Sequence, residues 1–156
     1  MLVKYYELMI IGNEDYGDKN IEYEYIDEMI AKHRQLSPND NIYIGSLGRN
    51  GAEYIAEQYA KEHDYIADVY DRCLIQGYKP GDPYYTDMFR ALETHLRLGS
   101  SIVSGFDILI FWDYKDEDVK ALIQIIKDFE KEYHLKVPYK IIDIRYRTKV
   151  ELIGDE

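Results

Sequence analysis

The sequence predicts an α/β fold: a mainly parallel sheet of five strands, with a sixth available from the C-terminal residues, covered by helices on both faces. Short apolar runs alternate with segments whose apolar residues recur at helical spacing. The run FDILIFW at 106–112 is apolar on both faces, which is typical of a central strand in a parallel sheet. Strands that alternate with helices pair in parallel and are joined by right-handed crossovers.

The first half of the chain supplies two strand–helix units. YYELMII predicts a strand over Tyr5–Ile11, and a helix follows from Ile21 until LSPND ends it. The inner face of this helix is Ile21, Tyr25, Met29 and Ile30. A second strand is predicted at Asn41–Gly45, followed by a helix from about Gly51. The second helix has the clearest periodicity in the chain, formed by Ala52, Ile55, Ala56, Tyr59 and Ala60.

The second half continues the alternation. A third strand is predicted at Tyr65–Tyr70, and after a linker rich in Gly, Pro and Tyr a helix runs from about Tyr84 to Leu98. The fourth strand is Phe106–Trp112 and the fifth is Tyr139–Ile144. The helix between them carries Val119, Leu122, Ile123, Ile126 and Phe129. The last residues, RYRTKVELIGDE, form either a short edge strand or a tail.

Composition is that of one ordinary globular domain over residues 1–156, with 46% hydrophobic and 31% charged residues. The longest apolar stretch is too short to cross a bilayer, and the N-terminus resembles a strand and not a signal peptide, so we expect a cytoplasmic protein. Cys73 is the only cysteine, and the four histidines form no HxxxH or HxH pair. We therefore expect no disulfide, no metal site and no cofactor.

The net charge of −11 argues against a broad nucleic-acid surface and against binding to acidic membranes. It leaves open a small anionic ligand, because a helix N-terminus and one arginine can hold a phosphate locally. An acidic face could also imitate nucleic acid towards a basic protein. The 17 tyrosines suit interfaces and ligand pockets, which favours a homo-oligomer, although biased base composition would explain the count equally well.

Ligands of open parallel sheets bind beyond the carboxyl ends of the strands, which directs attention to the loops at 12–20, 45–51, 71–83 and 113–118. In the first loop, Gly12 permits close backbone approach and Asn13 could bind a base or ribose. Glu14 and Asp15 could act as bases or bind a hydroxyl. The alternative is an acidic turn in which Asp18 or Asn20 caps the next helix.

The second loop, GSLGRNGAE, is the strongest candidate for a ligand cradle. Its glycines let backbone N–H groups converge, and they are Gly45, Gly48 and Gly51. Ser46 offers a hydroxyl, Arg49 offers a fork for phosphate or carboxylate, and the next helix points its positive end there. Glu53 could reach a ribose hydroxyl, serve as a general base or simply complement the helix dipole. The spacing matches neither a Walker loop nor GxGxxG, and a purely structural turn is the alternative.

The third loop carries Tyr84 and Tyr85, which could stack on a base, and Lys79 and Arg90, which could contact phosphate. Surface packing is the alternative for all four residues. Cys73 is interpreted as a small apolar group, because no histidine is placed to activate it.

Three stretches resemble the SLOG superfamily, and within it the YspA-like group: IGNEDY, IYIGSLGRNGAEYIAEQYAKEH and FDILIFWD. The resemblance spans Tyr5–Ile144 and implies a Rossmann-like three-layer sandwich that binds nucleotides or nucleotide-derived ligands. In the resembled pattern, Gly12 and Asn13 stand in the first turn. The second turn contains Gly45, Ser46, Gly48, Arg49, Gly51 and Ala52, with Glu53 in place of an aspartate.

The chain departs from this pattern at three places. Asn50 interrupts the Arg-Gly-Ala run, and Glu14 stands where an arginine is expected. After the fourth strand, DYKDEDVKA replaces a glycine-rich phosphate turn, and its four acidic residues repel phosphate. A ligand would then depend on Arg49 and aromatic groups, and Asn50 is also counted among the candidate ligand-binding residues.

Three functions follow as hypotheses. The first is binding of a nucleotide or nucleotide-derived signal without catalysis, as a sensor or sequestering protein; capture of an immune signalling nucleotide by a viral protein is a variant. The second is an N-glycosidase acting on nucleoside monophosphates through Glu53 or Glu14, for which the phosphate clamp is incomplete. The third is an acidic module that binds a basic partner protein or mimics nucleic acid.

Overall fold

The computed structural model describes residues 5–69, 96, 105–145 and 151–153. Its six strands form one sheet in the order β3-β2-β1-β4-β5-β6. The strands are β1 (Tyr5–Gly12), β2 (Asn41–Ser46), β3 (Ile66–Val69), β4 (Gly105–Trp112), β5 (Tyr139–Asp143) and β6 (Glu151–Ile153). The first five are parallel, and β6 pairs with β5 in the antiparallel direction. The predicted α/β, Rossmann-like sandwich is therefore confirmed.

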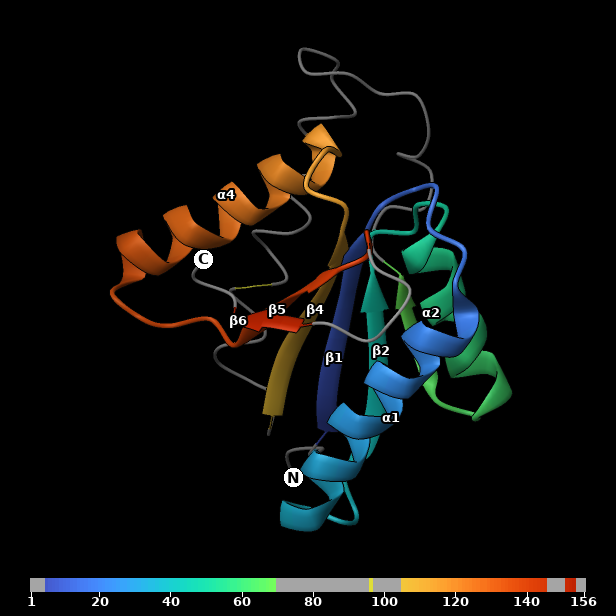
Figure 1. The fold of residues 1–156 in the computed structure, drawn as a ribbon. Coiled ribbons are helices and arrows are strands. Elements are labelled where there is room, and N and C mark those ends of the chain that lie inside the picture. The colour runs from blue at the N-terminus through green and yellow to red at the C-terminus, as the bar shows by residue number, and fades with distance from the viewer. Residues whose placement is uncertain (1–4, 70–95, 97–104, 146–150, 154–156) are drawn as a thin grey trace.

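Helices cover both faces of this sheet. The described helices are α1 (Lys19–Leu36), α2 (Ala52–Glu62) and α4 (Glu117–Tyr133). Figure 1 shows α1 and α2 on one face and α4 on the other. β1 therefore connects to a helix on one side of the sheet and β4 to a helix on the opposite side, so the strand order reverses between these two neighbours. This reversal is the position where open α/β sheets bind ligands.

β1 shows why a nearly continuous apolar run forms a central strand. Alternate side chains of a strand point to opposite faces of the sheet. Tyr6, Leu8 and Ile10 pack with α1 and α2, whereas Met9 and Ile11 pack with α4. Each face of the strand is covered by a helix, and both sets of side chains are buried.

The predicted element bounds agree closely with the described ones. α1 begins at Lys19 and not at Ile21, because the carboxylate of Asp18 caps the helix and lets it start two residues earlier than the apolar periodicity indicates. The C-terminal residues include an edge strand. Most of the helix predicted at 84–98 lies outside the described residues, although Leu96 is helical and buried.

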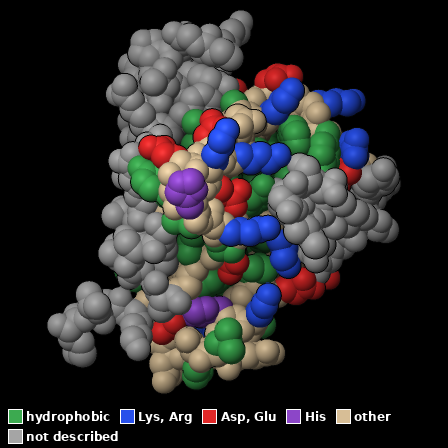
Figure 2. All heavy atoms as spheres, turned by 90° about the vertical axis from the view of Figure 1, so that its left-hand side faces the viewer, with side chains coloured by type: hydrophobic (Ala, Val, Ile, Leu, Met, Phe, Trp, Pro, Cys, Tyr) green, Lys and Arg blue, Asp and Glu red, His purple; other side chains and the backbone are tan. Residues whose placement is uncertain are grey.

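The side of the molecule that carries α4 bears charges of both signs. Exposed residues on this helix include Lys120 and Lys131 beside Glu117 and Asp128. Figure 2 shows basic and acidic side chains interspersed over this face. The described part of this face is therefore not uniformly acidic. None of the described helices is long and apolar enough to cross a membrane.

Candidate functional site

The turn between β2 and α2 is built around the carboxylate of Glu53. This side chain is 0% exposed and folds back from the first turn of α2. Its Oε1 accepts hydrogen bonds from the backbone N–H groups of Leu47 (3.1 Å) and Arg49 (3.3 Å), while the N–H of Gly48 donates to Oγ of Ser46 (3.1 Å). The amides of the turn do converge, but they converge on a carboxylate that belongs to the protein.

Arg49 completes this buried network. Its side chain is 2% exposed, and Nε and Nη2 lie 2.8 and 2.7 Å from Oε2 of Glu53. Nη2 also donates to the carbonyl of Gly12 at 2.8 Å. Burial alone would lower the pKa of Arg49, but the charge and hydrogen bonds of Glu53 outweigh it and raise that pKa above its ordinary value. The charged guanidinium therefore joins the loop after β1, through the carbonyl of Gly12, to α2, through Glu53. We call this set of buried contacts the buried brace.

The remaining nitrogen of Arg49, Nη1, faces the rim of the sheet. It is 3.5 Å from a carboxylate oxygen of Glu14 and 3.7 Å from one of Asp118. Neither contact is a hydrogen bond, so this buried nitrogen has no hydrogen-bond partner among the described residues. Arg49 thus links the loop after β1 with the start of α4, in addition to α2.

These contacts correct the expectation of an open cradle in the second loop. The backbone and side-chain groups expected to bind a ligand are buried or engaged within the protein: Gly45, Ser46, Gly48, Arg49 and Glu53. Asn50 is exposed at the tip of the turn. The geometry favours the structural turn over the ligand cradle. It also removes Glu53 as a general base, because both its oxygens are held and neither reaches solvent.

The first turn likewise serves to join elements. A Cβ on Gly12 would lie 2.6 Å from Cβ of Ala52, so this glycine permits close packing of α2. Asn13 is buried, its Oδ1 accepts from the N–H of Asp113 (3.2 Å), and its backbone carbonyl accepts from the N–H of Ala52 (3.2 Å). Asn13 therefore connects the loops after β1 and β4 with the N-terminus of α2 and is not free to read a base.

Substitution of Gly51 tests the close contact between the turn before α2 and the loop after β1. Its backbone has φ 75° and ψ −128°, and a Cβ there would lie 2.2 Å from the carbonyl oxygen of Asn13. We expect Gly51→Ala to lower the free energy of unfolding by about 3 kcal/mol or more, measured by urea denaturation. Gly17→Ala is the matched control, because no atom lies within 4 Å of its added Cβ, and its change should stay within about 0.5 kcal/mol. Equal stabilities of the two variants would contradict the described turn.

The starts of α1 and α4 are also capped by carboxylates of the protein. Oδ1 of Asp18 accepts from the N–H of Ile21 (3.1 Å), and Oδ1 of Asp116 accepts from the N–H of Val119 (3.0 Å). Asp113 accepts from the N–H groups of Lys115 and Asp116, at 2.8 and 2.9 Å. Partial burial opposes its ionisation, but these two hydrogen bonds hold the pKa of Asp113 below its usual range.

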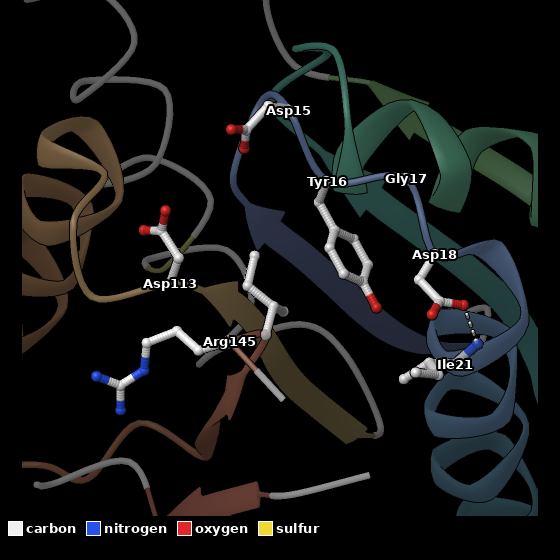
Figure 3. A pocket seen from close by; sticks show the side chains of 8 residues that line it. Asp15, Tyr16, Gly17, Asp18, Ile21, Asp113 and Arg145 are labelled. Atoms are coloured by element: carbon white, nitrogen blue, oxygen red, sulfur yellow. Dashed lines mark hydrogen bonds between the residues drawn. The ribbon is translucent and has the colours of Figure 1, made fainter. Parts of the chain in front are cut away.

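A cavity of about 450 Å³ opens at the reversal of the strand order, between the loops that follow β1, β4 and β5. Figure 3 shows its walls: Asp15, Tyr16 and Asp18 from the first loop, Asp113 from the second, and Arg145 from the third. Its volume is within the usual range for small-molecule sites. This cavity, and not the turn after β2, is the candidate site.

The side chains of the cavity divide into an aromatic wall and a carboxylate rim. The Tyr16 ring is partly buried and stacks on Phe111 with ring centres 5.5 Å apart. Desolvation, together with the nearby carboxylates of Asp18 and Glu22, raises the pKa of Tyr16 above its ordinary value. The phenol therefore stays neutral and can donate a hydrogen bond at physiological pH.

Among the described residues that line this cavity, Arg145 is the one with a basic side chain. Its Nε donates to Oδ1 of Asp143 at 2.8 Å, and its guanidinium lies 4.6 Å from the ring centre of Tyr114. In Figure 3 the guanidinium points away from Tyr16. The hydrogen bond from Arg145 is the main reason that the pKa of Asp143 is lowered. Arg145 is thus already committed to a carboxylate and an aromatic face.

Several of these residues carry no distinctive signal in the sequence. The loops after β1 and β4 are candidate loops by their position, but Tyr16, Asp113 and Arg145 do not stand out in them as ligand residues. Their shared signal is that each follows closely on the end of a parallel strand. Tyr84 and Tyr85 lie outside the described residues. Within the described ranges, no three His, Cys, Asp or Glu side chains are grouped to hold a metal ion.

Comparison with known proteins does not assign a family or a function to the chain. The chain matches no family model, no curated protein and no solved structure.

Proposed function

We propose that the protein binds a nucleoside-type ligand, either a nucleotide or a molecule derived from one, in the cavity between the ends of β1, β4 and β5, without transforming it. The observation that carries this proposal is the cavity itself: about 450 Å³ at the reversal of the strand order, with a tyrosine beside carboxylates. Tyr16 offers an aromatic face to a base. Asp15, Asp18 and Asp113 offer acceptors to ribose hydroxyls or to amino groups.

Binding without turnover is favoured over glycosidase chemistry. An N-glycosidase needs a carboxylate free to act on the sugar or its attacking water. Glu53 is buried against Arg49 and the turn amides. In the cavity, Asp18 and Asp113 already accept backbone hydrogen bonds. The acceptors therefore hold fixed positions, which suits recognition.

The test is a thermal-shift and calorimetry panel with adenosine, guanosine, cytidine, uridine, their 5′-monophosphates, ADP-ribose and a cyclic dinucleotide. At a hundredfold excess over Kd, a ligand adds about 2.7 kcal/mol to the free energy of unfolding, a rise in Tm of several degrees. Tyr16→Leu should weaken binding at least tenfold. Tyr54→Leu, which removes an exposed tyrosine of α2 outside the cavity lining, should leave binding unchanged. No binding by any member of the panel would refute the proposal.

A further inference from the structure

Three strand-to-helix turns at the ligand edge of the sheet lie within the described residues, and each of them is closed by a carboxylate of the chain. In this fold, a phosphate rests on the backbone amides of such turns and on helix N-termini. In this protein Asp18 caps α1 and Asp116 caps α4. Glu53 takes two amides of the turn before α2, and the N–H of Ala52 is held by the carbonyl of Asn13. In each of these described turns, the protein itself therefore occupies one or more of the backbone amides that would recognise phosphate.

The charge of the cavity adds a second obstacle to phosphate. Asp15, Asp18 and Asp113 line it, and the hydrogen bonds to Asp113 favour its charged form. Arg145 lies against Asp143 and Tyr114 and points away from Tyr16. A phosphate brought next to these carboxylates would be repelled by them, and the repulsion is stronger where less water penetrates between the charges.

The same arrangement accepts hydrogen-bond donors. Carboxylate oxygens accept from hydroxyl and amino groups, and a neutral or cationic ligand is not repelled by these carboxylates. We propose that the cavity selects the unphosphorylated form of its ligand, a nucleoside or a similar donor-rich molecule that is neutral or cationic, and rejects the corresponding phosphate. This inference rests on the proposed function, and it narrows the ligand class.

Calorimetric titration of matched pairs tests the inference: each nucleoside against its own 5′-monophosphate, in 50 mM and 500 mM NaCl. We expect the nucleoside to bind at least tenfold more tightly at low salt. The ratio should shrink at high salt, because salt screens repulsion between charges near solvent. Exclusion by shape alone would leave the ratio independent of salt.

Asp18→Asn provides the matched variant. Asparagine caps a helix about as well as aspartate, so the fold is retained while one negative charge of the rim is lost. The ratio of the nucleoside affinity to the monophosphate affinity should fall several-fold, because the lost charge repels only the phosphate. Loss of an acceptor for the nucleoside part would weaken both members of a pair and would cancel in this ratio. Glu24→Gln removes an exposed charge of α1 outside the cavity lining and should leave the ratio unchanged.

The outcomes separate the two proposals. A monophosphate that binds as tightly as its nucleoside, or more tightly, overturns the selectivity and leaves the proposed function standing. A ratio insensitive to both salt and Asp18→Asn overturns charge repulsion as the cause of the selectivity. Failure of every nucleoside and nucleotide to bind overturns the proposed function, and the selectivity falls with it.

Discussion

Replacing Arg49 with methionine is expected to lower the free energy of unfolding by about 3–5 kcal/mol, among the largest effects of any single substitution in this protein. Methionine keeps most of the side-chain volume but removes the charge that compensates Glu53, which is fully buried. It also removes the hydrogen bond to the carbonyl of Gly12. Glu53 would then be an uncompensated buried carboxylate. Urea denaturation monitored by far-UV circular dichroism measures the loss.

Two further variants separate this cause from general damage. Lys19→Met breaks an ion pair with Glu62 whose two side chains are about half exposed, and it should change stability by less than about 1 kcal/mol. Adding Glu53→Gln to Arg49→Met should recover part of the loss, because glutamine keeps an acceptor for the amides of Leu47 and Arg49 without the charge. A loss below about 1 kcal/mol in Arg49→Met would show that the buried brace does not exist in solution.

The fold is predictable because its signals are local. Local pattern indicates both the element type and the buried residues. Examples are the apolar runs at 5–11 and 106–112 and the helical spacing of Ala52, Ala56 and Tyr59. The order of the strands is not predictable in the same way, because alternation of strands and helices fixes parallel pairing but not which strands become neighbours. The sequence also does not decide whether the C-terminal residues form a strand or a tail, because an edge strand of three residues is too short to show a clear apolar pattern.

The turn after β2 shows why a ligand site could not be predicted reliably from the sequence. Glycines, a serine and an arginine before a helix describe both a phosphate cradle and a turn closed by the protein itself. The difference is the rotamer of Glu53, which folds back onto the amides of Leu47 and Arg49. The charge of a residue is visible in sequence, but the group that it neutralises is not. The cavity is equally hidden, because its walls come from loops about a hundred residues apart in the chain, as in the hydrogen bond from Asp113 to Asn13.

Glu22 shows a signal that is present in the sequence and easily missed. It lies one helical turn before Tyr25 and Ile26, on the face of α1 that packs against the sheet. An acid on an apolar helical face predicts a buried carboxyl. The structure buries Glu22 completely, and no described residue donates a hydrogen bond to either of its oxygens. Burial and, secondarily, the charge of Glu53 raise the pKa of Glu22 well above its ordinary value of 4.5.

This burial predicts a stability that falls as the pH rises. Well below pH 4.5 the carboxyl of Glu22 is protonated in both states and contributes no pH dependence. Above that pH the unfolded chain releases the proton while the folded chain retains it, so the free energy of unfolding declines until the pH passes the raised folded-state pKa. One such group lowers stability by up to about 1.4 kcal/mol per pH unit in this window.

Glu22→Gln removes this titration. The difference in free energy of unfolding between variant and wild type should therefore grow in favour of the variant from pH 5 to pH 7, as measured by urea denaturation at each pH. Glu14 and Asp107, whose pKa values are also raised by burial, titrate in both proteins and cancel in the difference. Glu24→Gln, on the exposed face of the same helix, should parallel the wild type. If the pH dependence of stability in Glu22→Gln is also the same as in the wild type, then Glu22 is hydrated or paired in solution. The first turn of α1 would then not exclude water from this carboxyl.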